Sequence, residues 1–407
     1  MYKPLLCRGL YRQLVPQDEP IAGDTVISLC TGTTLPLRKE LARLLLARYV
    51  AARPIFTTRP TATIERNVME VRLKKLTDQV IVITGATSGI GLTTARMAAK
   101  KGAKLVLVSR NQEALQQLAD ELTAQGTDVI HITADVGNQP DVEQVAQAAI
   151  ERFGRFDTWI NNAGISIFGR LEEVSAEDQH RLFQTNFWGV VYGSLAAVAH
   201  LKKHGGALIN LGSEVSDRAV PLQGMYSASK HAVKGFTDSL RMELENEGAP
   251  VSVTLIKPAA IDTLFTTHAK NYMDVEPALP APIYAPELAA EAILHAAQHP
   301  KRDVFVGAAA KMVSVGGNNM PRLLDKFMGA FMFRQQRSNK PTDIARRDAL
   351  YAPDPSQELK QRQGQATHVF ESCPYTALSL RSKTTAALLI GGGALLATWH
   401  LKRREAR

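Results

Sequence analysis

A tyrosine and a lysine four residues apart are the pair whose chemistry is easiest to interpret. Tyr226 and Lys230 lie in the run Tyr-Ser-Ala-Ser-Lys, so a helix would place both side chains on one face. A phenol has an ordinary pKa of about 10, and a fixed cation beside it favours the phenolate needed for acid-base work. Ser213 lies 13 residues upstream and could hydrogen-bond a substrate oxygen. Taken alone, the Tyr-Lys pair also fits a chance pair on an exposed helix.

A glycine-rich turn provides the second candidate site. The run Thr-Gly-Ala-Thr-Ser-Gly-Ile-Gly, from residue 84 to 91, joins an expected strand to an expected helix. Glycine permits a tight turn and close approach of the backbone to phosphate, while the helix N-terminus supplies free N–H groups. The turn therefore indicates a pyrophosphate site for a dinucleotide. A plain strand-to-helix turn is the alternative interpretation.

The end of the next expected strand bears on which dinucleotide would bind. Enzymes specific for NAD usually place an acid there to hold the ribose 2′-hydroxyl. This chain reads Val-Ser-Arg instead, and Arg110 could pair with a 2′-phosphate. The residue predicts NADP(H), with a solvated surface arginine as the alternative.

The elements that must position these residues alternate between β-rich apolar runs and helical stretches. This alternation is typical of βαβ units, and it predicts an α/β doubly wound parallel sheet of about seven strands in a single catalytic domain over residues 69–310. The expected strands are 80–83, 105–108, 129–132, 158–160, 207–211, 251–256 and 304–306, and the expected helices are 92–101, 112–124, 142–153, 231–247 and 286–298.

Charge and cysteine usage exclude some classes of protein. The net charge of +9 resides in the flanks, because residues 69–335 carry 26 Lys and Arg against 28 Asp and Glu. A nucleic-acid-binding core would show a cationic footprint, so no nucleic-acid partner is expected. Cys7, Cys30 and Cys373 have no metal or redox spacing, so we expect free thiols, no metal site and a cytoplasmic catalytic domain.

Together these motifs resemble the short-chain dehydrogenase/reductase family over residues 78–265, and less closely to 310. The resemblance rests on six motifs in the family's order and spacing. They are the glycine motif at Gly85, Gly89 and Gly91, Asp135 in Ala-Asp-Val, the run Asn161-Asn162-Ala163-Gly164, Asn186, Ser213, and the pair Tyr226 and Lys230. One departure is Ala259 after Pro258, where the family usually has glycine.

The resemblance implies a Rossmann-type fold and an oxidoreductase that moves a hydride between NADP(H) and a carbonyl or alcohol substrate. An NADP-binding scaffold or redox sensor that recruits partners through its flanks is the alternative. The implied catalytic residues are Asn186, Ser213, Tyr226 and Lys230. The implied cofactor-binding residues are Gly85, Thr87, Ser88, Gly89, Ile90, Gly91, Arg110, Asn111, Asp135, Val136, Asn162, Ala163, Gly164, Tyr226, Lys230, Pro258 and Thr263.

The stretch after Thr263 folds over the substrate in this family. Leu264, Phe265, Tyr272 and Met273 give it an apolar character, which favours a hydrophobic substrate. Simple packing of the lid is the alternative. His268 is expected to be a lid or surface residue, because the proton donor is already assigned to tyrosine.

The flanks divide into four further segments. Residues 1–68 form an N-terminal extension, for which a leader, an accessory segment and sequence upstream of the true start all stay open. Residues 311–334 are expected to form a helical extension, and residues 335–380 a polar linker. Residues 381–407 hold an uncharged run, 384–399, of about 24 Å as a helix, against about 30 Å for a bilayer core. A C-terminal membrane anchor and a buried or interfacial helix both stay open. The family's habit of pairing through long helices makes a homodimer or homotetramer a further expectation.

Overall fold

Seven parallel strands form the central sheet, in the order β11-β7-β6-β4-β1-β2-β3. The computed structural model describes residues 71–364 and 368–381. All seven predicted strands are present, and the predicted doubly wound sheet is confirmed. Their bounds are β1 Val80–Thr84, β2 Lys104–Ser109, β3 Val129–Thr133, β4 Thr158–Asn161, β6 Gly206–Leu211, β7 Val251–Pro258 and β11 Asp303–Val306.

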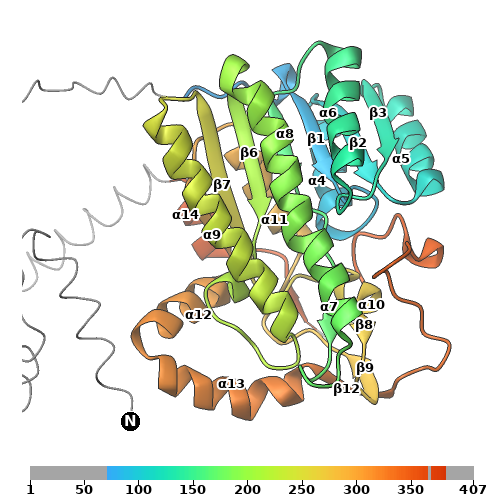
Figure 1. Ribbon diagram of the computed structural model, residues 1–407, viewed down its shortest axis with the longest axis vertical. Helices are drawn as coiled ribbons and strands as arrows, with labels where there is room; N and C mark the ends of the chain where they lie inside the picture. The colour runs from blue at the N-terminus through green and yellow to red at the C-terminus, as the bar shows by residue number, and fades with distance from the viewer. Residues whose placement is uncertain (1–70, 365–367, 382–407) are drawn as a thin grey trace, which may run out of the picture. The chain divides into compact units, whose positions relative to one another are not determined.

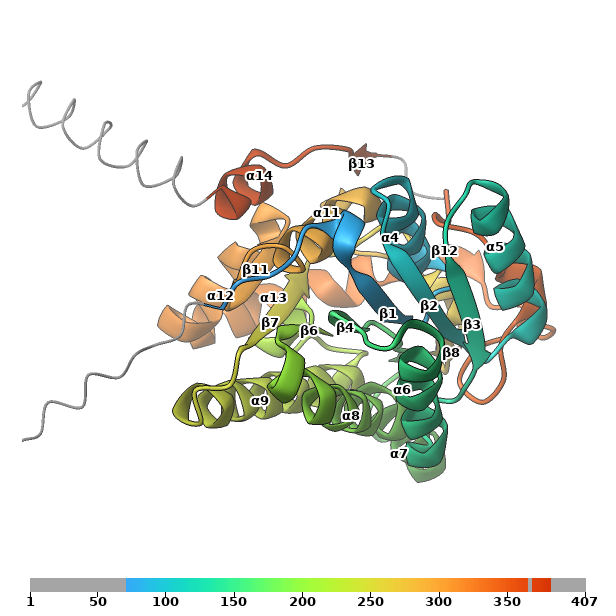
Figure 2. The same cartoon turned by 90° about the horizontal axis from the view of Figure 1, so that it is seen from above.

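Helices cover both faces of this sheet because its apolar strands are buried on both sides. One core cluster packs the sheet against α4, α5 and α11, and a second packs it against α6, α8 and α9 (Figure 2). The bounds are α4 Gly89–Lys100, α5 Gln112–Ala124, α6 Gln139–Phe153, α8 Gly189–His204, α9 Gly224–Asn246 and α11 Pro286–Ala296.

The strand order reverses at the centre of the sheet, between β1 and β4. In open α/β sheets, ligands bind outside the carboxyl ends of the strands at such a switch point. The glycine-rich loop follows β1, Asn162 follows β4, Ser213 lies just beyond β6, and Thr263 follows β7. The sheet therefore brings residues far apart in sequence to one edge.

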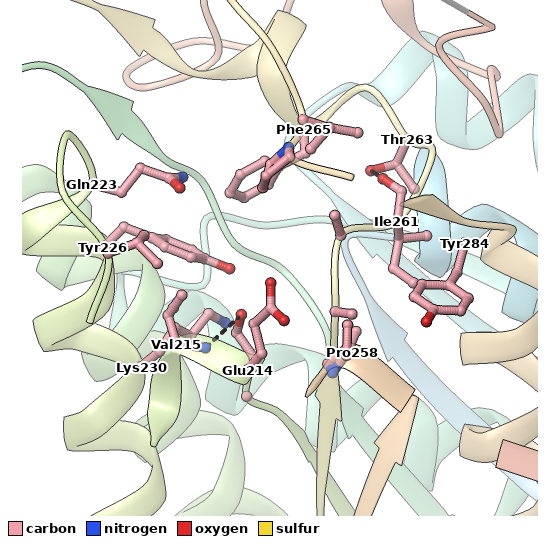
Figure 3. Close-up of a pocket in the computed structure, with 18 of the residues that line it drawn as sticks. Glu214, Val215, Gln223, Tyr226, Lys230, Pro258, Ile261, Thr263, Phe265 and Tyr284 are labelled. Carbon is pink, nitrogen blue, oxygen red and sulfur yellow. Dashed lines mark hydrogen bonds between the residues drawn. The ribbon is translucent and has the colours of Figure 1, made fainter. Parts of the chain in front are cut away.

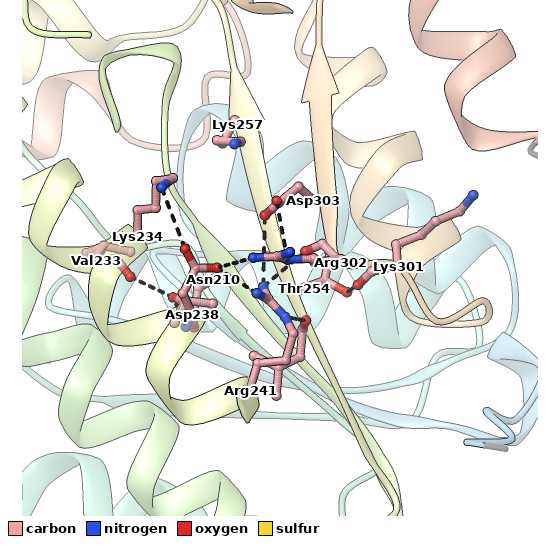
Figure 4. A network of polar contacts seen from close by, with 12 residues as sticks. Asn210, Val233, Lys234, Asp238, Arg241, Thr254, Lys257, Lys301, Arg302 and Asp303 are labelled. Carbon is pink, nitrogen blue, oxygen red and sulfur yellow. Dashed lines mark hydrogen bonds and ion pairs between the residues drawn. The ribbon is translucent and has the colours of Figure 1, made fainter. Parts of the chain in front are cut away.

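A network of polar contacts fixes α9 against the sheet (Figure 4). Arg241 pairs with Asp238 at 2.7 Å through Nη1, and its Nε donates to the carbonyl oxygen of Val253 in β7 at 2.9 Å. The Arg241 side chain is buried, so these bonds face little competition from water. They anchor the helix whose first turns carry Tyr226 and Lys230.

The C-terminal part of the domain wraps around the carboxyl edge of the sheet. Helices α12 (Ala308–Asn319) and α13 (Pro321–Gln335) contain the residues expected to be helical, 311–334. Figure 1 shows them at the same end of the main sheet as the small strands β8 (Lys270–Asn271), β9 (Val275–Pro277) and β12 (Arg337–Pro341).

The prediction of a polar linker over 335–380 is wrong for the described residues. Strand β12 pairs with β9, and β13 (Val369–Phe370) pairs with β10 (Ile283–Tyr284). We call residues 343–364, which lie between β12 and β13 in the sequence, the cover segment. This segment lies across the carboxyl edge of the main sheet. Arg346 holds this segment by pairing with Glu276 at 3.0 Å. The prediction treated polar composition as the sign of an unfolded linker. In this segment the polar side chains instead form bonds with the folded domain.

Several expectations concern residues that the structure does not describe. These are the N-terminal extension 1–68, Cys7, Cys30 and the apolar run 384–399. Within 71–364 and 368–381, no helix is long and apolar enough to cross a membrane. Cys373, the one cysteine in that part of the chain, is a buried free thiol.

Candidate active site

A cavity of about 690 Å³ opens at the carboxyl edge of the sheet, between the predicted catalytic residues and the C-terminal helices. Residues after β1, β4, β6 and β7 form its floor. Side chains of α12 and α13 form the opposite wall, which is largely apolar and includes Met312, Val313, Leu324, Phe327, Met328 and Met332. The volume lies within the range of about 300–1,000 Å³ typical of small-molecule sites.

Ser213 and Tyr226 meet at the floor of this cavity. The Ser213 Oγ accepts a hydrogen bond from the Val215 amide at 3.3 Å, and so caps the short helix η3 (Glu214–Ser216). The Ser213 and Tyr226 side chains both line the cavity. Burial raises the pKa of Tyr226 above its ordinary value, and the neighbouring Ser213 hydroxyl partly opposes this effect.

Lys230 lies one helical turn after Tyr226. Its Nζ donates to the carbonyl oxygen of Leu211, at the end of β6, at 2.8 Å, and lies 5.7 Å from the centre of the Tyr226 ring. Burial lowers the pKa of Lys230 to about 8. The sequence predicts that Lys230 lowers the pKa of Tyr226, but in this structure burial of the phenol outweighs any such effect.

Asn186 supports this group from below rather than lining the cavity. It lies on a π-helical turn, η2 (Gln184–Trp188), a rare geometry that often marks functional sites. Its Oδ1 accepts from the Ile165 amide at 2.9 Å, and its Nδ2 donates to the Ile165 carbonyl oxygen at 2.9 Å and the Ser229 hydroxyl at 3.2 Å. The side chain is buried and fully engaged, so it fixes the strand end beside Lys230.

The glycine-rich loop has the tight geometry that its sequence predicts. Gly85 has a φ of +66°, a left-handed conformation that favours glycine. A Cβ on Gly91 would lie 2.0 Å from the Gly85 carbonyl oxygen, so no other residue fits there. Asn162 closes the loop through its Nδ2, which donates to the Thr84 carbonyl oxygen at 2.9 Å. The N-terminus of α4 faces the cleft, where the Gly89 amide donates to the Lys360 carbonyl oxygen at 3.0 Å.

A second, smaller cavity of about 100 Å³ shares a wall with the first, including Gly85, Gly164 and His268. Three of its lining residues have buried polar atoms with no hydrogen-bond partner: Thr185 Oγ1, His268 Nε2 and Glu358 Oε2. An unsatisfied buried polar atom costs about 1–3 kcal/mol, so these atoms require a polar partner.

The residues around the two cavities fit a dinucleotide. Hydroxyl, imidazole and carboxyl groups beside a helix N-terminus suit the ribose hydroxyls and the pyrophosphate. The smaller cavity, at about 100 Å³, is below the usual size of ligand sites.

Two predicted cofactor residues have other contacts in this structure. Arg110 lines the smaller cavity, but its Nη2 donates to the carbonyl oxygen of Ala349 at 2.5 Å, and its Nη1 to that of Tyr351 at 3.2 Å. The Asn111 side chain accepts from the Ala114 amide at 3.0 Å and caps α5.

Most of the remaining predicted residues line one of the two cavities. Asp135 pairs with Arg181 at 2.5 Å, while Ala259 lies outside the left-handed region and so takes the place of glycine without strain. The residues that line at least one cavity are Gly85, Thr87, Ser88, Gly89, Ile90, Arg110, Asp135, Val136, Asn162, Ala163, Gly164, Ser213, Tyr226, Lys230, Pro258 and Thr263.

Only part of the lid that is predicted after Thr263 lines the larger cavity. Leu264 and Phe265 line the larger cavity, whereas Tyr272 packs below it and donates a hydrogen bond to Asp178 at 2.7 Å. His268 lines both cavities, and burial lowers its pKa.

Glu214 is a site residue that the sequence interpretation missed. Figure 3 shows its carboxyl and the Tyr226 phenol pointing into the same space. Burial raises the pKa of Glu214 to about 7. A glutamate directly after Ser213 was a usable signal, because in such sheets the residues beyond the carboxyl ends of the strands face the ligand.

The fold and the site define a nucleotide-binding oxidoreductase with a serine, a tyrosine and a lysine at the carboxyl edge of a doubly wound sheet. Known proteins agree with this class. A family model described as short chain dehydrogenase matches residues 79–273. A Bacillus subtilis (strain 168) protein named "Uncharacterized oxidoreductase YxnA" is 48% identical over 338 residues, which cover 82% of this chain and 93% of that protein.

Two solved structures are similar over most of the described domain. A short-chain dehydrogenase/reductase from Burkholderia phymatum in complex with NAD has a TM-score of 0.56 and 28% identity, covering 67% of this chain and 99% of that one. A short-chain dehydrogenase from Burkholderia cenocepacia J2315 in complex with NADP has a TM-score of 0.54 and 26% identity, covering 63% and 99%. The chain belongs to the short-chain dehydrogenase/reductase family, and it is an enzyme that acts on CH–OH or C=O groups.

Proposed function

We propose that this enzyme reduces the carbonyl group of a hydrophobic substrate, with Tyr226 as the proton donor. The observation that carries the proposal is the convergence of Ser213, Tyr226 and Lys230 on one cavity whose far wall is apolar. The same geometry argues against the scaffold alternative, since a binding module has no chemical need for these three residues in register.

The cofactor supplies the hydride when it is bound. The Ser213 hydroxyl and the Tyr226 phenol bind the carbonyl oxygen, and Tyr226 transfers its proton to that oxygen as negative charge develops. Lys230 keeps two further N–H donors beyond its bond to Leu211, and they would hold ribose hydroxyls.

Substrate class follows from the walls of the larger cavity. Methionine, leucine and phenylalanine side chains from α12 and α13 enclose it, and burial of apolar surface stabilises binding by about 25 cal/mol per Å². Methionines adapt to irregular shapes, so the wall suits a bulky, rigid or long-chain apolar carbonyl compound. A cytosolic site of action and a homodimer or homotetramer remain predictions from the sequence.

The test is an absorbance assay of reduced dinucleotide with a panel of lipophilic aldehydes and ketones. Tyr226→Phe should lose about 10²- to 10⁴-fold in turnover while cofactor binding is retained, because only the transferable proton is removed. Tyr272→Phe is the matched control, since its hydroxyl bonds Asp178 outside the cavity, and it should keep turnover. Full turnover in Tyr226→Phe would refute the assignment.

A further inference from the structure

The cover segment reaches into the part of the cleft where the adenosine ribose of a dinucleotide lies. It is tied to the glycine-rich loop by two main-chain bonds: the Leu359 amide donates to the Thr87 carbonyl oxygen at 2.8 Å, and the Gly89 amide donates to that of Lys360 at 3.0 Å. Leu359 has a φ of +59°, which is unfavourable for a non-glycine residue by about 1–3 kcal/mol. Contacts with the loop therefore set its conformation.

Glu358 comes immediately before this strained residue, and its carboxyl lines the smaller cavity. Arg110 and Ser109, at the end of β2, line the same cavity. The end of β2 is where dinucleotide-binding folds place the group that recognises the ribose 2′ position. The end of β2 itself has no acid, but the cover segment brings the carboxyl group of Glu358 into the same cavity from about 250 residues further along the chain.

The two charged residues at this position are not equally available. Both terminal nitrogens of Arg110 already donate to main-chain carbonyl oxygens of residues 349–351, at 2.5 to 3.3 Å. Glu358 Oε2, in contrast, is buried and has no partner. Burial raises the pKa of Glu358, while the Thr87 hydroxyl and the Arg110 guanidinium favour its charged form. Glu358 Oε2 is therefore a free acceptor at this position, while Arg110 already makes three bonds to the cover segment with its five N–H groups.

We propose that Glu358 is the residue that selects the cofactor, by accepting a hydrogen bond from the ribose 2′-hydroxyl of NAD(H) and opposing the 2′-phosphate of NADP(H). The inference rests on the proposed function and replaces the NADP preference that Arg110 alone predicts. Arg110 acts through the cover segment, as a positioning residue that holds it over the ribose.

The test is a titration of the full chain with NADH and with NADPH, followed by nicotinamide fluorescence, for the wild type and for Glu358→Gln. The wild type should bind NADH at least about 10-fold more tightly than NADPH, since a hydrogen bond to a charged group is worth about 10- to 100-fold in affinity. Glu358→Gln keeps the shape and removes the charge, so it should reduce that ratio by at least about 10-fold.

Two further variants separate local from general effects. Glu371→Gln removes an exposed carboxylate of the C-terminal region that pairs with Arg362, and it should leave the ratio within about twofold. Arg110→Ala should weaken NADH and NADPH binding by a similar factor, because it loosens the cover segment. An NADPH-specific loss in Arg110→Ala would show instead that Arg110 binds the 2′-phosphate.

Tighter binding of NADPH by the wild type, or an unchanged ratio in Glu358→Gln, would overturn the role of Glu358 while leaving the oxidoreductase proposal intact. Binding of neither dinucleotide by the wild type would overturn the proposed function, and this inference with it.

Discussion

The catalytic end of the main sheet and the cover segment meet in one cleft but are held in place by different contacts. Ser213 follows a buried parallel strand, and Tyr226 begins a 23-residue helix that the Arg241 network fixes to β7. The cover segment has little regular structure. Arg110 donates to the carbonyl oxygen of Ala349 in the segment, and Arg346 of the segment donates to the carbonyl oxygen of Ala269. The core builds the first region, whereas the second is held mainly by polar contacts and buries the Leu350 side chain in a small cluster with Ile165 and Leu182.

This difference assigns separate tasks to the two regions. A proton donor and its partners need fixed geometry, which rigid elements supply. The residues over the smaller cavity need to admit a ligand and then hold it, which suits a segment that side-chain hydrogen bonds attach to the domain.

If the catalytic end is held by the sheet and α9, removing Arg241 should have the largest effect on stability. Arg241→Ala leaves Asp238 without one of its partners and the Val253 carbonyl without its donor, so we expect a loss of about 3–5 kcal/mol in the free energy of unfolding, measured in urea. The matched control is Lys202→Ala, which removes an exposed pair with Glu247 and should cost less than about 1 kcal/mol. Equal losses would contradict a special role for the network.

Ser213→Ala should affect catalysis rather than stability. Loss of one donor to the developing oxyanion typically lowers kcat by about 10²- to 10³-fold, or about 2.7–4 kcal/mol of barrier. The unfolding free energy should fall by only about 1 kcal/mol, the value of a helix cap. Ser252→Ala, at a buried residue of β7 outside the two cavities, provides the comparison, and similar turnover in both variants would count against Ser213.

Glu214→Gln should change stability in a pH-dependent way. Because burial raises the pKa of Glu214 to about 7, the folded state favours the protonated carboxyl, and wild-type stability falls as pH rises from about 4.5 to 7. Glutamine has no such penalty, so the variant should gain about 1–3 kcal/mol relative to wild type at pH 8 and nothing at pH 4. Urea unfolding at both values measures this difference, and a gain that is the same at both would exclude the mechanism.

Arg346→Ala tests the other region and should have the smallest effect on global stability. Arg346 holds the cover segment through Glu276 and the carbonyl oxygens of Thr266 and Ala269, so its loss should speed trypsin cleavage after Arg347 at least about tenfold. The free energy of global unfolding should change by less than about 1 kcal/mol, because this segment opens locally. Arg337→Ala, which removes a more exposed pair, should leave cleavage unchanged. A cooperative loss of stability in Arg346→Ala would show that the two regions unfold together.

The catalytic end could be predicted from the sequence because its signals are local. Strands such as Val80–Thr84 are uninterrupted apolar runs, and Tyr226 and Lys230 lie one helical turn apart. The geometry of the glycine-rich loop likewise depends on residues that are close in sequence, since only glycine fits at position 91, against the Gly85 carbonyl oxygen.

The cover segment could not be predicted in this way, because its place depends on partners far away in sequence. The bond between Arg110 and Ala349 spans 239 residues, and no periodic pattern encodes it. Polar composition predicts a linker when such partners are unknown. The bonds of Arg110 to main-chain carbonyl oxygens could not be predicted for the same reason, since those oxygens belong to that segment.

Deuterium transfer tests the central claim most directly. Reduced dinucleotide carrying deuterium at C4 of the nicotinamide is mixed with a lipophilic carbonyl substrate, and mass spectrometry detects the label in the product alcohol. The wild type should transfer one deuterium to the carbinol carbon, and Tyr226→Phe, at equal cofactor occupancy, should form at least about 100-fold less labelled alcohol. Labelled product at the wild-type rate in Tyr226→Phe, or no labelled product from a wild type that binds the cofactor, would contradict the account.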